Sequence, residues 1–160
     1  MSKQPTENLS SLRTVDWKDN KVVMIDQTKL PNDFIFVEYD DFNQVANAIR
    51  TLVVRGAPAI GVSGAFGLAL AVLQSKAITK DELLSDLENA KNILFETRPT
   101  AVNLGWGLEK IMNVAKSGDT IQQIKELVIS TAKKWQMKIL KLIKPWEKMV
   151  LFFLMIMILL

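Results

Sequence analysis

Apolar and polar residues alternate in three short runs near the start of the chain. Residues 14–17 and 21–26 are separated by Lys18-Asp19-Asn20, which is typical of a hairpin turn between two strands. Residues 34–39 form a third run after the Pro31-Asn32 loop. The pattern predicts a small antiparallel sheet built from these runs.

The apolar spacing changes to the helical period after Asp40 and Asp41, either of which can cap a helix. A helix is predicted over 42–53, with apolar residues at Phe42, Val45, Ala46, Ile49, Leu52 and Val53. Thr79 with Glu82, and Thr120 with Gln123, have the spacing of capping boxes and predict two more helix starts. The expected fold is α+β and mostly helical, with a small antiparallel sheet followed by a helical bundle.

Residues 55–67 read RGAPAIGVSGAFG and allow two interpretations. Pro58 fits the first turn of a helix, where its missing N–H costs nothing. The free N–H groups around Gly56 and Ala57 lie at the positive end of the helix dipole and could hold an anion, and Arg55 adds a guanidinium suited to phosphate. Alternatively, the glycines only let another backbone pack closely, as a buried core helix requires. These glycines are Gly61, Gly64 and Gly67.

The same part of the chain lacks charge over residues 57–73. This stretch is shorter than the ~20 residues that a helix needs to span a bilayer, and glycines and Ser63 interrupt it. We therefore expect a buried helix here.

A second motif repeats this arrangement at residues 97–104, which read TRPTAVNL. Arg98 and Pro99 are followed by Thr100, which can cap a helix, and then by an apolar-periodic run. Two helix starts, each preceded by an arginine, could converge on one anion. Alternatively, Arg98 only pairs with a nearby carboxylate such as Glu96, because exposed ion pairs are common. The apolar run comprises Leu104, Leu108, Ile111 and Val114.

The two motifs together resemble the family of S-methyl-5-thioribose-1-phosphate isomerase, an enzyme of methionine salvage. The wider family includes ribose-1,5-bisphosphate isomerase and regulatory subunits of the exchange factor for eukaryotic initiation factor 2. The resemblance covers residues 10–132 and begins with LRTVDW at 12–17. It implies that Arg55, Gly56, Ala57 and Arg98 bind the sugar phosphate.

The resemblance also carries expectations about activity. It implies an aldose–ketose isomerase that needs no metal or organic cofactor and forms a homodimer. In this family a larger, Rossmann-like C-terminal domain supplies a catalytic Cys and Asp, and both are expected to lie beyond the end of this chain. The 160-residue chain is therefore expected to be inactive. The alternative within the family is a regulatory, non-enzymatic subunit.

Composition restricts the chemistry further. The chain has neither cysteine nor histidine, which excludes a thiol nucleophile and an imidazole acid or base within these residues. Residues 1–11 are polar and are expected to be a flexible terminus without a signal peptide, which favours a cytoplasmic protein. Trp17, Trp106 and the phenylalanines are expected in the core.

Charge is divided unevenly along the chain. Residues 1–132 hold 14 Lys and Arg against 16 Asp and Glu, whereas residues 133–160 hold six Lys and one Glu. The basic balance therefore belongs to the tail, and no nucleic-acid partner is expected. We divide the chain into a flexible terminus at 1–11, an N-terminal domain at 12–132 and a tail at 133–160.

The tail has two explanations. Its lysines precede residues 149–160, which contain no polar residue and are too few to span a bilayer of ~20 helical residues. Such a segment could lie on an anionic membrane.

The other explanation, which we favour, is a frameshift. Loss of one base from a run of A at Lys133 and Lys134 would turn AAA AAA ATG GCA into AAA AAA TGG CA. A consistent back-translation of the tail, read one base earlier, gives the hydrophilic peptide MADEDIETNKAMGKNGALFFDDNDTI, which resembles the isomerase family in this region. If Met comes next in that frame, its ATG supplies a TGA stop codon directly after Leu160.

Overall fold

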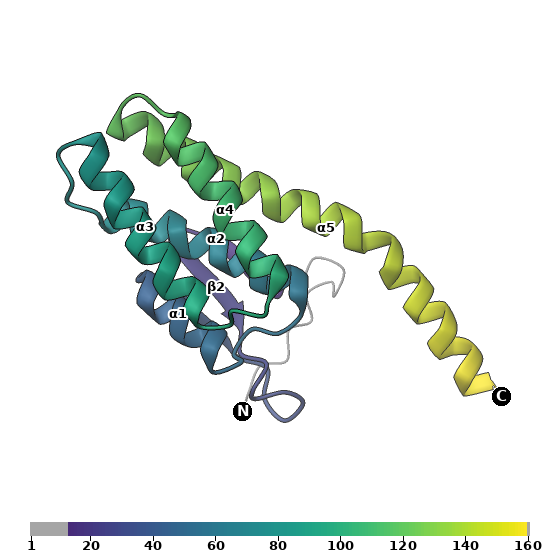
Figure 1. The fold of residues 1–160 in the computed structure, drawn as a ribbon. Coiled ribbons are helices and arrows are strands. Elements are labelled where there is room, and N and C mark those ends of the chain that lie inside the picture. Colours follow the sequence, from purple (N-terminus) through teal and green to yellow (C-terminus); the bar gives the residue numbers. More distant parts are fainter. Residues whose placement is uncertain (1–12, 160) are drawn as a thin grey trace.

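A computed structural model describes residues 13–159, with side chains as far as residue 143. Within these residues three strands are followed by five helices, which confirms the predicted α+β, mostly helical class (Figure 1). The predicted flexible terminus at 1–11 lies outside the described residues.

The strands form one antiparallel sheet in the order β1-β2-β3. Asp19 and Asn20 join the first two strands and have φ angles of 50° and 58°, as a two-residue type I′ hairpin turn requires. Val15 pairs with Met24 across this hairpin. The predicted sheet is confirmed, although its third strand begins two residues later than expected. The strands are β1 (Val15–Lys18), β2 (Lys21–Ile25) and β3 (Phe36–Tyr39).

Helix α1 (Phe42–Arg50) is shorter than predicted. Its N-cap is Asp41, whose carboxylate accepts a hydrogen bond of 2.7 Å from the Asn43 N–H. The predicted extension to residue 53 is wrong, because Leu52 adopts a φ of 63° and leaves the helical conformation. The Gln27 N–H then donates to the Val53 carbonyl at 3.0 Å and ties this loop to the chain that follows β2.

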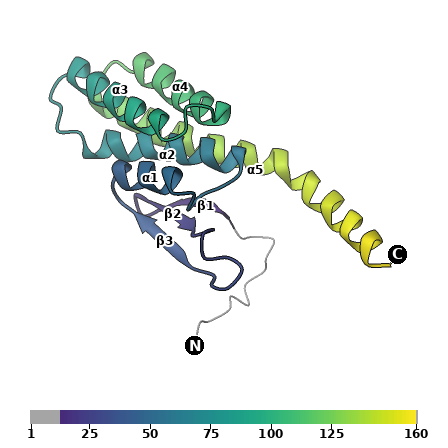
Figure 2. The same ribbon diagram turned by 60° about the horizontal axis from the view of Figure 1, so that its bottom comes forward.

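Helix α2 (Ala57–Gln74) is the centre of the fold. Figure 2 shows it between the sheet with α1 on one side and the pair α3 (Lys80–Glu96) and α4 (Val102–Ser117) on the other. Phe66 of α2 packs against Trp17 of β1 with ring centroids 5.4 Å apart. In the described part of the chain, α2 alone is long and apolar enough to cross a membrane, but 72% of it is buried within the fold. It is therefore a core helix, as its sequence predicted.

The start of α3 is a complete capping box. The Thr79 hydroxyl accepts from the Glu82 N–H at 3.2 Å, and the Glu82 carboxylate accepts from the Thr79 N–H at 3.1 Å. The same carboxylate accepts from the Ile78 N–H at 2.9 Å. These backbone donors, Ile78 first and Thr79 second, lower the pKa of Glu82 below its ordinary value.

Helices α3 and α4 are joined by one lysine. The ammonium of Lys91 lies 2.6 Å from a carboxylate oxygen of Glu109 on α4 and 3.0 Å from one of Glu88 on its own helix. The hydrogen bond to Glu109, above all, raises the pKa of Lys91. The lysine side chain is mostly covered, with 19% exposed, whereas Lys21, the basic partner of Glu38, is 44% exposed.

Helix α5 (Ile121–Leu159) begins with half of the predicted capping box. Thr120 accepts from the Gln123 N–H at 3.2 Å, but the Gln123 side chain accepts from the Asp119 N–H at 3.0 Å, not from that of Thr120. The helix runs on through Lys133 without a break, and its far end extends away from the other elements (Figure 1).

Candidate functional site

The start of α2 is an open helix N-terminus. Gly56 is its N-cap with a φ of 89°, a left-handed conformation that favours glycine. The Ile60 N–H donates to the Gly56 carbonyl at 3.0 Å, so the N–H groups of Ala57 and Ala59 precede the first intrahelical bond. Arg55, Gly56 and Ala57 are all exposed, and a Cβ on Gly56 would meet no atom within 4 Å. The backbone donors of this helix start are therefore accessible to a ligand.

Arg55 is held by its own loop. Its Nε donates to the Leu52 carbonyl at 3.4 Å, which leaves the two terminal nitrogens of the guanidinium for other partners. No ion pair within residues 13–143 involves Arg55.

The start of α4 is also uncapped. The N-cap is Ala101, which has no side-chain acceptor, so the prediction that Thr100 caps this helix is wrong. A tight turn in which the Ala101 N–H donates to the Arg98 carbonyl at 2.9 Å moves the helix start one residue beyond Thr100. Arg98 is half-buried, and among the ion pairs of the described side chains none joins it to Glu96. The interpretation of Arg98 as a surface partner of Glu96 is therefore not supported.

The two helix starts lie side by side. A Cβ placed on Gly61 of α2 would come 2.7 Å from the backbone oxygen of Asn103, in the first turn of α4. Both N-terminal ends also lie at the same end of the molecule in Figures 1 and 2. The structure thus brings together the helices that follow Arg55 and Arg98. Both can present positive charge and free N–H groups to one region, an arrangement suited to an anion.

The glycines of α2 also fulfil the packing interpretation. Gly64 faces the Leu104 side chain and Gly67 faces that of Leu94, each so closely that a Cβ would lie less than 3.0 Å away. The matching glycine of α4, Gly107, was not predicted, and its Cβ would lie 2.5 Å from the Gly61 carbonyl oxygen. The signal for it was the repeated glycine in residues 105–107.

Several aromatic residues lie outside the core, against expectation. Trp106 is 65% exposed, and Phe36 and Phe95 are also exposed. On α4 the buried positions include Leu104 and Leu108, and Trp106 lies about 200° around the helix from Leu104. The prediction of a core Trp106 is wrong because its helical position faces away from α2. Trp17 is half-buried and packs on the core as predicted.

Other hollows lie elsewhere on the described fold. One of about 440 Å³ on α5 is lined by Met137 and four lysines, and one of about 410 Å³ on α4 is lined by residues that include Trp106 and Lys110. An apolar cavity of about 70 Å³ lies between β1, α2 and α5, lined in part by Val15, Val62 and Ile139, and is too small for a sugar phosphate. Within the described residues no group of three or more acidic, cysteine or histidine side chains could hold a metal ion.

Comparisons with known proteins place this site in a family context. The model of the initiation factor 2 subunit family matches residues 53–148, which include both arginine motifs and continue beyond Lys133. The methylthioribose-1-phosphate isomerase of Geotalea uraniireducens is 51% identical over 107 residues, covering 67% of this chain and 31% of that protein.

Two solved structures share the fold. The 5-methylthioribose 1-phosphate isomerase of Pyrococcus horikoshii is 45% identical with a TM-score of 0.76, covering 83% of this chain and 38% of that one. The delta subunit of translation initiation factor eIF-2B from A. fulgidus is 42% identical with a TM-score of 0.74, covering 78% and 36%. The chain spans about a third of the length of these relatives. Because the family model matches more than half of its residues, the chain belongs to the initiation factor 2 subunit family.

Proposed function

We propose that this chain supplies the phosphate-binding part of an aldose–ketose isomerase acting on S-methyl-5-thioribose 1-phosphate. Two relatives are named as isomerases of this substrate, at 51% and 45% identity. The observation that carries the proposal is the contact between Gly61 and Asn103, because it sets two uncapped helix starts beside each other, each preceded by an arginine.

Each element has a distinct part in holding the phosphate. Arg55 and Arg98 supply guanidinium groups, which bind phosphate oxygens through paired N–H donors. Ala57 adds a backbone N–H at the start of α2, and Gly56 allows the backbone to approach the ligand without a side chain in the way. Two helix dipoles add positive potential at the same place.

The reaction explains why the phosphate must be bound. A phosphate on the C1 oxygen prevents the ring from opening to a free aldehyde, so the bond between C1 and the ring oxygen must break as hydrogen is transferred from C2 to C1. The C2 hydroxyl loses its proton and becomes a carbonyl, and the ring oxygen takes up a proton. That transfer needs a positioned acid and base. The chain contains neither cysteine nor histidine, and we propose that it binds the substrate without turning it over. For the longer relatives the same proposal includes a cytoplasmic homodimer.

Titration of the purified chain with S-methyl-5-thioribose 1-phosphate tests this proposal. We expect saturable binding by calorimetry, and much weaker binding of the unphosphorylated sugar. Arg55→Ala and Arg98→Ala should each weaken binding by about tenfold to hundredfold, since a hydrogen bond to a charged group contributes about 1.5–3 kcal/mol. Arg50→Ala, which removes an exposed arginine of α1, is the matched control and should bind like the wild type.

Two results would contradict the proposal. Equal binding of the phosphorylated and unphosphorylated sugars would show that the chain has no phosphate site. Measurable production of the ketose phosphate by the purified chain would show that the chain is active.

A regulatory subunit is the second candidate function. The likeness to the eIF-2B delta subunit, at 42% identity and a TM-score of 0.74, is nearly as strong as that to the isomerase structure. Saturable binding of a nucleotide, with no response to the sugar phosphate in the same titration, would favour this candidate.

A further inference from the structure

The closest approach between α2 and α4 is a contact of backbone against backbone. A Cβ on Gly107 would lie 2.5 Å from the Gly61 carbonyl oxygen, and a Cβ on Gly61 would lie 2.7 Å from the Asn103 carbonyl oxygen. Real Cβ atoms essentially never come closer than 3.0 Å to another heavy atom. Any side chain at either position therefore separates the two helices or tilts one of them.

The other tight glycines of α2 differ in this respect. A Cβ on Gly64 would meet the Leu104 side chain at 2.5 Å, and one on Gly67 would meet the Leu94 side chain at 2.9 Å. The ends of leucine side chains can move to another rotamer, whereas a carbonyl oxygen moves only with its helix. Gly61 and Gly107 alone among the helical glycines of α2 and α4 thus fix the separation of the two backbones.

The crossing point lies close to both helix starts. Gly61 is four residues beyond Ala57, the first residue of α2, which is about 6 Å along the helix axis. Asn103 is the second residue of α4, and Gly107 lies one turn further on. Because both helix starts are so near the crossing, a displacement there moves both of them by about the same amount.

We infer that Gly61 and Gly107 are positioning residues for the phosphate site, because they set the separation at which Arg55 and Arg98 can act on one anion. This inference rests on the proposed function. An alanine at Gly107 requires a displacement of about 1 Å to reach ordinary van der Waals distance from the Gly61 oxygen. Charge-assisted hydrogen bonds keep their strength only over a few tenths of an ångström, so one of the two helix starts would lose its contact with the phosphate.

Helix α4 provides a matched control. Gly105 lies two residues from Gly107, and its added Cβ would meet only the Phe95 ring, at an ordinary 3.5 Å. Both Gly→Ala changes improve helix propensity by the same ~1 kcal/mol, so a difference between them reports the crossing alone.

The test compares phosphate affinity in folded variants of the full chain. Inorganic phosphate and S-methyl-5-thioribose 1-phosphate are titrated into ¹⁵N-labelled wild type, Gly105→Ala and Gly107→Ala well below their melting temperatures. We expect affinity within twofold of wild type for Gly105→Ala and at least tenfold weaker for Gly107→Ala. Wild-type affinity in a folded Gly107→Ala overturns the inference while the proposed function stands. No binding by the wild type removes the proposed function and this inference with it.

A second variant and a second readout separate positioning from stability. Gly61→Ala places its Cβ 2.7 Å from the Asn103 oxygen, a milder overlap than that of Gly107→Ala, and serves if Gly107→Ala does not fold. If neither variant folds, these glycines act on stability alone and the inference is wrong. In whichever variant folds, Arg98→Ala should cost less affinity than it does in the wild-type chain, because the two arginines no longer share the anion. An equal cost in both backgrounds also overturns the inference.

Discussion

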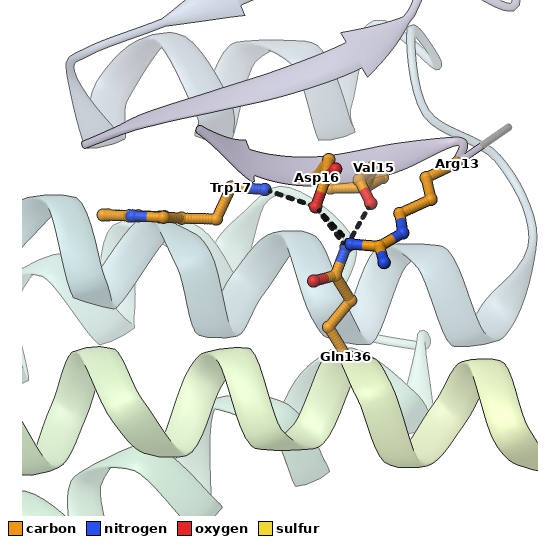
Figure 3. A network of polar contacts seen from close by, with 5 residues as sticks. All are labelled: Arg13, Val15, Asp16, Trp17 and Gln136. Carbon is orange, nitrogen blue, oxygen red and sulfur yellow. Dashed lines mark hydrogen bonds and ion pairs between the residues drawn. The ribbon is translucent and has the colours of Figure 1, made fainter. Parts of the chain in front are cut away.

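Gln136 of α5 donates its side-chain N–H to the backbone carbonyl of Val15 in β1, at 2.7 Å and across 121 residues of sequence (Figure 3). The same nitrogen lies 2.9 Å from the Asp16 carboxylate, which also accepts from Arg13 and from the Trp17 N–H. Because β1 is an edge strand, its outer carbonyls need partners from another element. Gln136, only 4% exposed, supplies one and anchors α5 to the sheet.

Replacement of Gln136 by alanine should destabilise the chain by about 1–3 kcal/mol, because the buried Val15 carbonyl loses its donor. Urea unfolding followed by circular dichroism measures this loss. Gln122→Ala is the control on the same helix, since Gln122 bonds only to Glu126 at the surface, and it should change stability by less than about 0.5 kcal/mol. Equal effects of the two substitutions would show that the contact with β1 contributes nothing.

Sequencing the gene across codon 133 in independent isolates should show a run of A one base longer than this chain implies. The restored frame is expected to read MADED directly after Lys134, with an alanine at the position of Gln136. A shorter run in every isolate, with no family-like peptide in the adjacent frame, would instead make the tail a genuine part of the protein.

Acid should weaken the start of α3. The pKa of Glu82 is lowered in the folded chain, so its contribution is complete above the ordinary carboxyl value of 4.5 and is lost as the pH falls through the lowered pKa. Glu82→Gln should therefore lower the melting temperature at pH 7 and reduce its fall in acid. Thr79→Ala removes the other half of the capping box and should cost about 1 kcal/mol at either pH. If the melting temperature of Glu82→Gln falls in acid as much as that of the wild type, other carboxylates cause the acid sensitivity.

The Lys91 bridge should respond to alkali with the opposite sign. Its pKa is raised, so the bridge is complete below the ordinary value of 10.5 and is lost as the pH rises through the raised pKa. Lys91→Met should cost about 0.5–1 kcal/mol at pH 7 and lessen the loss of stability at high pH. Lys21→Met, which breaks the more exposed pair with Glu38, should cost less. If Lys21→Met lowers the free energy of unfolding more than Lys91→Met does, burial of the lysine does not decide the strength of these ion pairs.

Local signals in the sequence were sufficient for much of the fold. Asp19 and Asn20 predicted the hairpin because their side chains tolerate a positive φ, and Thr79 with Glu82 predicted a helix start because the box needs only neighbouring residues. The end of α1 was missed because Leu52 looks helical by spacing. In the structure Leu52 adopts a left-handed conformation, the Val53 N–H donates back to the Ala48 carbonyl at 3.0 Å, and the Gln27 N–H donates to the Val53 carbonyl. Apolar spacing alone does not show where a helix stops.

The candidate site shows the same limit. Arg55 and Arg98 were identified from their motifs, yet their functional role remains a prediction. That their helices touch depends on Gly61 and Asn103, which are distant in sequence. The repeated glycine in residues 105–107 was the local signal for Gly107, but it does not show that a carbonyl oxygen of another helix lies against that residue. Exposure of Trp106 likewise follows from which face of α4 meets α2.

The length of α5 has a hydrodynamic consequence. Its 39 residues span about 58 Å at 1.5 Å per residue, whereas a compact chain of 160 residues has a radius of gyration of about 15 Å. The helix extends well past the other elements (Figure 2). In solution the molecule should therefore tumble anisotropically and sediment more slowly than a sphere of its 18.0 kDa mass, so that size-exclusion volume alone would overstate how many copies associate.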